Sequence, residues 1–385
     1  MISTWSFPNR IVFGWGAIEQ LPSAAERLGA SRPLVVTDPG VARSGLLARL
    51  ADLLGRSGTG FAVFDRVEGN PTEASVYPGL DVFRSEHCDS VVALGGGSAL
   101  DTAKAIRLKV THDLPLEEYD DLKNGGDRIS ADVPPMIAIP TTAGTGSEVG
   151  RSTVITLKAT GRKTVIFSPH LIPSVAIADP ELTVALPPHL TAATGMDAMT
   201  HSVEAYLSIG FHPMCDAIGI KGVEIVGKNL SAAVRDGRNA EARTNMMAAA
   251  IMGAVAFQKG LGTVHSLAHP LSTVAGMHHG LTNAILLPHV MRFNLPVSRE
   301  RLADIAVALG VDRHGMSADS AAAAAIDAIE KLNVEIGIPK RLRDAGVREE
   351  LIPTMVPLAM ADGCRLCNPR PTSAEDMDTL YRAAF

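Results

Sequence analysis

Seven of the chain's 12 histidines fall in about a quarter of the sequence, together with one well-placed aspartate. Asp197 and His201 are four residues apart with no Gly or Pro between them. A helix would place both side chains on one face, one turn apart. Between Gly195 and His289 the histidines are His201, His212, His265, His269, His278, His279 and His289. This clustering predicts a set of metal ligands.

The ligand types indicate which metal and which chemistry the set would support. One carboxylate with two or three imidazoles suits a divalent metal of borderline hardness, such as Fe(II), Zn(II) or Mn(II). Such a set leaves a coordination position for water or an alcohol oxygen. Any single histidine here is as readily a core or capping residue, but the set as a whole favours a metal site.

A glycine-rich turn in the first half of the chain is typical of phosphate binding. The apolar run 90–94 leads into Gly95-Gly96-Gly97-Ser98 and then into a helix that carries Asp101 and Lys104. A strand that feeds such a turn lets backbone N–H groups approach a pyrophosphate, and the helix dipole favours its charge. The pattern is not G-x-G-x-x-G, and glycines also serve tight turns without a ligand.

A second strand and loop of the same kind strengthens this interpretation. The run 136–140 leads into Thr141-Thr142-Ala143-Gly144-Thr145-Gly146-Ser147-Glu148. Two such loops predict one nucleotide bound between them. Around them, the segments 33–37, 45–54 and 61–64 read as strand, helix and strand, and 153–157 with 163–167 reads as a hairpin.

The pattern of apolar residues changes near residue 184. Beyond Leu186-Pro187-Pro188 no strand-like alternation is evident, whereas 241–257 and 317–332 keep helical spacing. We therefore predict two domains: a Rossmann-like dinucleotide-binding domain, 1–184, and an all-helical metal-binding domain, 185–385. The predicted active site is the cleft between them, a common place for ligand pockets.

Composition narrows the class of protein. A length of 385 residues favours two domains, and a net charge of -6 gives no electrostatic footprint for nucleic acid. No apolar run approaches 18 residues and the N-terminus lacks a signal pattern, so we expect neither a membrane span nor export. Four cysteines are too few for a disulfide scaffold and suit the cytoplasm. We interpret Cys364-x-x-Cys367 as structural.

The metal set and its surroundings resemble the iron-containing (group III) alcohol dehydrogenase family. The resemblance is carried by Asp197, His201, His265 and His279, with the motifs 261–265 and 283–289 around them, and extends from Phe13-Gly14 to Asn368-Pro369-Arg370. It implies a dehydroquinate synthase-like fold, NAD as cofactor, Fe(II) or else Zn(II) as metal, and a homodimer.

The resemblance also implies roles for single residues. Asp197, His201, His265 and His279 would be the metal ligands, although the family usually has proline where this chain has His278. His269 would lie beside the nicotinamide as a proton relay. The implied cofactor contacts are Asp38, Asn70, Gly96, Gly97, Ser98, Asp101, Thr141, Thr142, Thr145 and Lys163. Asn70 is equally a turn residue before Pro71, Asp101 could merely charge a helix N-terminus, and Asp38 marks a preference for NAD.

A dinucleotide facing a metal with an open position indicates alcohol oxidation, or in reverse the reduction of an aldehyde or ketone. Together with the resemblance, this makes a primary alcohol or its aldehyde the expected substrate. Three alternatives stay open: a maleylacetate reductase, which lacks the metal set; a dehydroquinate-synthase-type lyase, which expects different histidine spacing; and a metal or nucleotide sensor. Lys259 or Arg151 could face the cleft and recognise an anionic group on the substrate.

Overall fold

The chain forms two compact units in a computed structural model that describes residues 5–385. The first, here called the sheet unit, comprises Phe7–Thr142 and Gly146–Ala185. The second, the helical unit, comprises Leu186–Phe385 together with two short segments, residues 5–6 and Ala143–Thr145. The three-residue segment 143–145 belongs by its contacts to the helical unit although the sequence on both sides of it belongs to the sheet unit.

The sheet unit is built on six parallel strands. Their order is β1 (Arg10–Phe13), β8 (Val175–Ala178), β5 (Met136–Pro140), β4 (Ser90–Gly95), β2 (Pro33–Val36) and β3 (Ala62–Phe64). Parallel neighbours need crossover connections, which here include α1 (Leu21–Arg27), α2 (Pro39–Arg43), α3 (Leu46–Arg56), α4 (Glu73–Ser85) and α5 (Gly97–Thr111). Because β4 and β5 are parallel neighbours, the loops that follow them emerge side by side at the carboxyl ends of the strands.

The central strands β4 and β5 are buried on both faces of the sheet, which explains why their sequences are almost continuously apolar. In β4, Val91 and Ala93 pack into one core with residues of α4 and α5. Val92 and Leu94 point the other way, into a core with α1 and α3. All six residues of β4 are buried, so the strand that carries the first glycine loop is held on both sides.

The strand, helix and strand predicted over 33–64 are confirmed, with β2 parallel to β3. The predicted hairpin is also confirmed as the antiparallel pair β6 (Ser152–Thr156) and β7 (Lys163–Phe167). Sequence reasoning missed β1, which has only four residues, and α4, which contains Pro78. A short edge strand and a helix with an internal proline both give weak local patterns.

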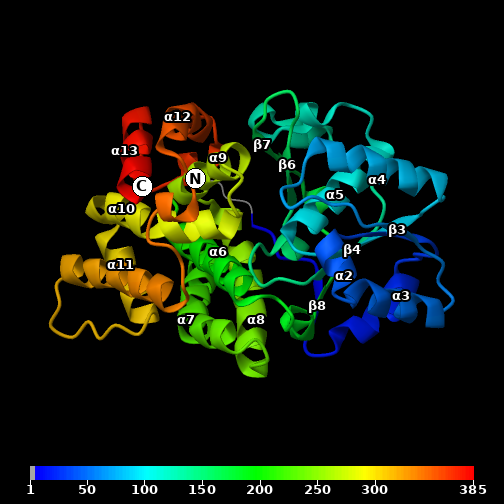
Figure 1. Cartoon of the computed structure of the whole chain (residues 1–385), viewed down its shortest axis with the longest axis horizontal. Coiled ribbons are helices and arrows are strands. Elements are labelled where there is room, and N and C mark those ends of the chain that lie inside the picture. Colours follow the sequence, from blue (N-terminus) through cyan, green and yellow to red (C-terminus); the bar gives the residue numbers. More distant parts are fainter. Residues whose placement is uncertain (1–4) are drawn as a thin grey trace. The chain divides into compact units, whose positions relative to one another are not determined.

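The helical unit has no β-strand among its described residues. Its helices are α6 (Pro188–Leu207), α7 (Pro213–Arg235), α8 (Ala240–Ala256), α9 (Thr263–Val274), α10 (His279–Ala308), α11 (Ala318–Glu335), α12 (Ile352–Met360) and α13 (Ala374–Ala384). Helix α6 is buried along most of its length and lies among the others (Figure 1). Its polar residues Asp197 and His201 are therefore inside the unit.

Glycines let the neighbouring helices approach α6 closely. A Cβ atom on Gly195 would lie 2.2 Å from Leu230 Cδ1 of α7. One on Gly253 of α8 would lie 3.1 Å from both the Ala198 carbonyl oxygen and His201 Cβ. The small residues thus bring the backbone of α8 against the turn of α6 that carries His201.

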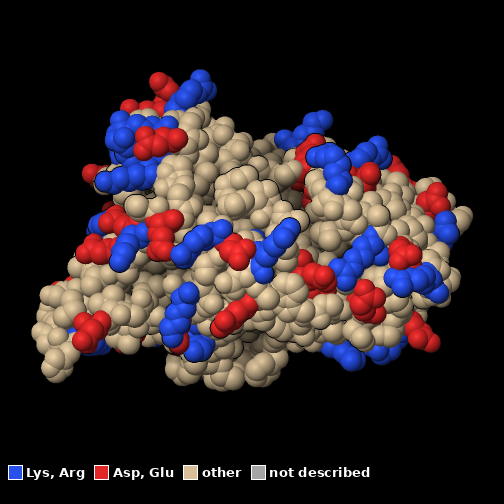
Figure 2. Space-filling view, turned by 60° about the horizontal axis from the view of Figure 1, so that its bottom comes forward, with Lys and Arg blue, Asp and Glu red and all other residues tan. Residues whose placement is uncertain are grey.

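Within residues 5–385, no single helix is long and apolar enough to cross a membrane, and one bent pair, Ala240–Lys259 with Thr263–Val274, meets that test by length and composition only. Figure 2 shows acidic and basic side chains interspersed on the face that it displays. That face has no large patch of a single charge.

Candidate metal and nucleotide sites

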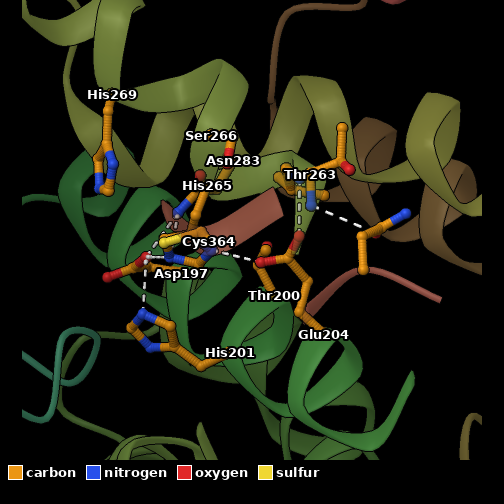
Figure 3. Close-up of polar contacts among 12 residues, drawn as sticks. Asp197, Thr200, His201, Glu204, Thr263, His265, Ser266, His269, Asn283 and Cys364 are labelled. Carbon is orange, nitrogen blue, oxygen red and sulfur yellow. Dashed lines mark hydrogen bonds and ion pairs between the residues drawn. The ribbon is translucent and has the colours of Figure 1, made fainter. Parts of the chain in front are cut away.

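Three helices of the helical unit supply the predicted metal ligands. Asp197 and His201 lie one turn apart on α6, and His265 lies on α9 (Figure 3). His279 is the first residue of α10. The side chains of Asp197 and His265 are each only 2 % exposed. Residues more than 80 positions apart are thus gathered around one buried carboxylate.

The imidazole nitrogens converge on one oxygen atom of that carboxylate. Asp197 Oδ1 lies 3.7 Å from His201 Nε2, 4.0 Å from His265 Nε2 and 3.6 Å from His279 Nε2. The donor atoms of Asp197, His265 and His279 all lie within 4.8 Å of one another, a set that His201 does not join at this limit. An arrangement in which lone pairs face lone pairs suits a cation, and the donor types suit a divalent one.

The protonation state of His201 also suits a metal ligand. Burial lowers its pKa to about 4, although the Asp197 carboxylate opposes this shift. The ring is therefore neutral at pH 7. A neutral imidazole offers the lone pair that a metal requires.

Glu204 fixes the orientation of His265. Its Oε2 lies 2.5 Å from His265 Nδ1, and its Oε1 accepts from the backbone N–H of Val264 at 2.7 Å. A metal-binding histidine commonly donates its other N–H to a carboxylate in this way. Burial lowers the pKa of His265, but Glu204 outweighs it and the net direction is upward. Gly262 leaves room for the carboxylate, since a Cβ there would lie 2.8 Å from Glu204 Oε1.

Asn283 makes a comparable contact with Asp197. Its Nδ2 donates to Asp197 Oδ1 at 2.7 Å and lies 3.4 and 3.3 Å from the Nε2 atoms of His265 and His279. The amide group therefore holds the same carboxylate oxygen on which the imidazoles converge. Asn283 is one turn along α10 from His279, so both side chains project from the same face of that helix.

His269 pairs with Asp362. Its Nδ1 lies 2.7 Å from Asp362 Oδ2, while Asp362 Oδ1 accepts from Ser266 Oγ at 3.0 Å. Burial raises the pKa of Asp362, yet the His269 contact outweighs burial and the pKa falls below its ordinary value. With Nδ1–H donated to the carboxylate, Nε2 of His269 is left as the proton acceptor.

Sequence reasoning missed the roles of Glu204 and Asp362, and it noted Asn283 only as part of the motif 283–289. Glu204 did carry a signal, because it follows Asp197 by seven residues on the same helix and so shares its face. Asp362 is 93 residues from His269, and its short polar surroundings give no comparable pattern.

In the sheet unit the two glycine-rich loops face each other. Gly96 precedes the first turn of α5, and a Cβ atom on it would lie 3.3 Å from Thr142 Cγ2. The backbone N–H of Thr141 donates to the Gly95 carbonyl at 2.9 Å. The structure thus brings together the backbone of both predicted loops at a helix N-terminus, an arrangement that favours an anion.

Other predicted cofactor residues lie around these loops. Ser98 Oγ donates to the Gly69 carbonyl at 2.7 Å, which ties the first loop to the turn that carries Asn70. Asp38 Oδ1 caps α2 by accepting from Gly40 N at 2.8 Å. The other oxygen of Asp38 lies 3.3 Å from where a Cβ on Gly95 would be. Asp38 therefore combines a turn role with a place beside the first loop.

The last three predicted cofactor residues to be placed are Asp101, Lys163 and Thr145. Asp101 accepts from Ser147 Oγ at 2.6 Å and from Val154 N at 3.1 Å, so its carboxylate links α5 to the second loop and β6. Lys163 is buried at the start of β7. Thr145 belongs to the segment 143–145 of the helical unit, whose Gly144 packs against Thr194 of α6. Their cofactor contacts stay predictions.

The hypothesis that Lys259 faces a substrate is wrong. Its side chain is fully buried, and Nζ lies 2.5 Å from Asp216 Oδ1 and 3.1 Å from the Tyr206 carbonyl oxygen. The ammonium is therefore neutralised inside the helical unit. The Arg151 guanidinium lies 5.1 Å above the Phe167 ring.

Comparison with known proteins places both units in one family. Residues 8–180 match the family model "Iron-containing alcohol dehydrogenase", and residues 191–385 match "Fe-containing alcohol dehydrogenase family, C-terminal". The chain is 42% identical over 381 residues to the 1,3-propanediol dehydrogenase of Citrobacter freundii, covering 98% of this chain and 97% of the relative. It is 38% identical over 385 residues to the NAD-dependent methanol dehydrogenase of Bacillus methanolicus, covering 100% of both. The crystal structure of 1,3-propanediol oxidoreductase superposes with a TM-score of 0.96, at 41% identity and full coverage of both chains.

Proposed function

The chain belongs to the iron-containing alcohol dehydrogenase family, and on that premise we propose that it transfers hydride between a small primary alcohol, or its aldehyde, and NAD(H). The observation that carries this proposal is the buried carboxylate of Asp197 with three imidazole nitrogens within 4.0 Å of it. A metal-free reductase of this fold would have no need to gather these donors.

The residues that would hold the metal are Asp197, His201, His265 and His279. Family membership favours iron, and zinc is the alternative that the same donors accept. A divalent metal in this place supplies Lewis-acid chemistry, which lowers the pKa of an alcohol hydroxyl and polarises a carbonyl group. Glu204 and Asn283 orient two of the ligands, so that the site is held in shape by the chain itself.

His269 is the residue that we assign to proton transfer. Asp362 accepts its Nδ1–H, which leaves Nε2 free to take the hydroxyl proton during alcohol oxidation and to return it during aldehyde reduction. The carboxylate stabilises the ring while it carries the extra proton. His269 therefore needs both its position on α9 and its partner.

The sheet unit would bind the dinucleotide. The loops around Gly96 and Thr142 would receive the pyrophosphate, with the remaining contacts from Asp38, Asn70, Gly97, Ser98, Asp101, Thr141, Thr145 and Lys163. Asp38 would hydrogen-bond the adenosine ribose and so favour NAD over NADP. We further propose a cytoplasmic homodimer, which light scattering coupled to gel filtration would test.

The decisive experiment follows NADH absorbance while the iron-loaded protein meets a panel of short aldehydes, with alcohols and NAD for the reverse direction. We expect oxidation of NADH by at least one unbranched aldehyde, and loss of the signal after the metal is removed with a chelator. Aldehydes with a terminal hydroxyl or carboxylate group belong in the panel because they define the substrate class. Turnover that survives complete metal removal would refute the proposal.

A further inference from the structure

A second group of potential metal ligands lies next to the first. The donor atoms of His269, Asp362 and Cys364 all lie within 4.8 Å of one another. His269 and Asp362 are buried, and Cys364 is partly buried. Unlike the set around Asp197, this group contains a sulfur atom. It also includes one half of the Cys-x-x-Cys motif, to which the proposed reaction assigns no task.

The chain builds this group from two directions. His269 projects from α9, while Asp362 precedes a short 3-10 helix, Gly363–Cys367, that carries Cys364. Asp362 Oδ1 accepts from the backbone N–H of Cys364 at 2.9 Å and from Ser266 Oγ at 3.0 Å. These bonds fix the carboxylate between the imidazole and the turn that carries the thiol. The three donors are therefore held in place before any cation arrives.

We propose that His269, Asp362 and Cys364 form a second metal site, which takes divalent cations softer than Fe(II), such as Zn(II) or Cd(II), in preference to Fe(II). One thiolate, one imidazole and one carboxylate are zinc ligands, and sulfur selects softer metals than the all-nitrogen-and-oxygen set around Asp197. The preference follows from ligand softness and from the higher place of zinc than iron in the general order of affinity.

Binding has a defined proton balance. The Cys364 thiol gives up its proton when sulfur binds the cation, and that proton leaves to solvent. The imidazole keeps one proton, which moves to its other nitrogen when the nitrogen beside Asp362 becomes a ligand. Burial and the neighbouring Asp362 carboxylate raise the pKa of the Cys364 thiol well above its usual range. The thiol is therefore protonated until a cation displaces the proton.

The two sets of donors are in direct contact through His269. The rings of His269 and His279 stack with their centroids 5.3 Å apart, and those of His269 and His265 lie 6.0 Å apart. A cation on the second set would occupy the histidine to which we assign proton transfer. Soft metals would thus inhibit the enzyme while iron stays in place. This inhibitory consequence rests on the proposed function, whereas the binding itself does not.

The binding test uses Cd(II), because a cadmium–thiolate bond produces an ultraviolet charge-transfer band. The protein is first loaded with Fe(II), then titrated with Cd(II) and analysed for both metals. The variant is Cys364→Ser, and the matched control is Cys367→Ser, which changes a thiol of the same turn that lies outside the donor set. We expect the wild type and Cys367→Ser to gain one cadmium with the band, and Cys364→Ser to lose affinity by roughly tenfold or more.

Two outcomes would overturn the binding proposal: no band in the wild type, or a band that disappears in Cys367→Ser and persists in Cys364→Ser. His269→Gln is a second variant, and it should weaken cadmium binding while the thiol remains. Inhibition is measured separately with Zn(II) on the iron-loaded enzyme. Equal inhibition of wild type and Cys364→Ser, or loss of iron during inhibition, would refute the inhibitory role. The absorbance assay needs no turnover, so it stands even if the proposed reaction fails.

Discussion

Both units bury charged side chains, but they compensate the charge in different ways. In the sheet unit, Lys104 is fully buried and its ammonium donates to oxygen atoms of the chain. In the helical unit, the carboxylate and imidazoles around Asp197 are all electron-pair donors that face one another. The Lys104 ammonium thus finds its acceptors within the protein, whereas the cluster around Asp197 has more electron-pair donors than it has groups to accept them. The difference separates a structural cluster from a binding site.

The Lys104 cluster joins the elements that carry the nucleotide loops. Nζ lies 2.7 Å from the Ser147 carbonyl, 3.0 Å from that of Gly150 and 2.8 Å from that of Ser152. Burial lowers the pKa of Lys104 to about 8, opposed by the charge of Asp101. The ammonium is therefore still mostly protonated at pH 7. It links α5, which follows the first loop, to the end of the second loop and the start of β6.

The largest effect should come from breaking the Lys104 cluster. In Lys104→Met we expect the free energy of unfolding of the sheet unit to fall by about 3–5 kcal/mol, because the buried charge of Asp101 and several carbonyls lose their partner. Denaturant titration measures this loss, and fluorescence titration measures the accompanying loss of NADH binding. The control is Lys228→Met, whose solvent-exposed ion pair with Glu224 should contribute little to stability. Equal stability of the two variants would contradict the structural role of Lys104.

The second-largest effect should come from removing the carboxylate of the cluster around Asp197. Asp197→Ala takes away the only anionic ligand, so metal content and activity should fall together, by roughly 100-fold or more. NADH binding to the sheet unit should be retained, unlike in Lys104→Met. Asp319→Ala, at an exposed position of the helical unit, is the matched control. Unchanged metal content in Asp197→Ala by elemental analysis would refute the assignment of the site.

The comparison also explains how far sequence alone could go. The Asp197 and His201 pair and the Gly95–Gly97 turn were predictable because their spacing is local to one helix or one turn. The role of Lys104 in linking α5 to the second loop and β6 was not predictable, since three of its acceptors lie 43 to 48 residues away. Lys259 was misjudged for the same reason: only the fold reveals Asp216 beside it. Sequence spacing thus indicates which side chains share a face, and tertiary contacts decide which of them have partners.

A smaller effect should follow from loosening one ligand without removing it. In Glu204→Gln the amide no longer presents two acceptor oxygens to His265 Nδ1 and the Val264 N–H. We expect metal affinity, measured by competition with a chelator, to fall by roughly 10–100-fold while the fold is kept. Glu224→Gln, on the surface of α7, should leave affinity unchanged. Gly262→Ala should resemble Glu204→Gln, because the new methyl group would displace the carboxylate.

The smallest effect concerns Asp38, which follows β2 in the sheet unit and is only partly buried. Repulsion between its carboxylate and the 2′-phosphate of NADP amounts to about 1 kcal/mol at 4 Å in water and about 4 kcal/mol at an effective dielectric constant of 20. Because the position is partly solvated, we expect the lower end, a preference for NAD of several-fold. Asp38→Gly should narrow that preference, chiefly by improving NADP binding.

Asp38 also caps α2, so a second variant must separate charge from capping. Asp38→Asn retains a side-chain oxygen that can accept from Gly40 N and removes only the negative charge. If charge sets the preference, both variants should shift the NAD/NADP ratio of kcat/KM in the same direction, and Asp38→Asn should keep the wild-type stability that Asp38→Gly loses. A ratio that stays at the wild-type value in both variants would leave Asp38 as a capping residue alone. Of the charged clusters compared here, only the one around Asp197 would then be a binding site.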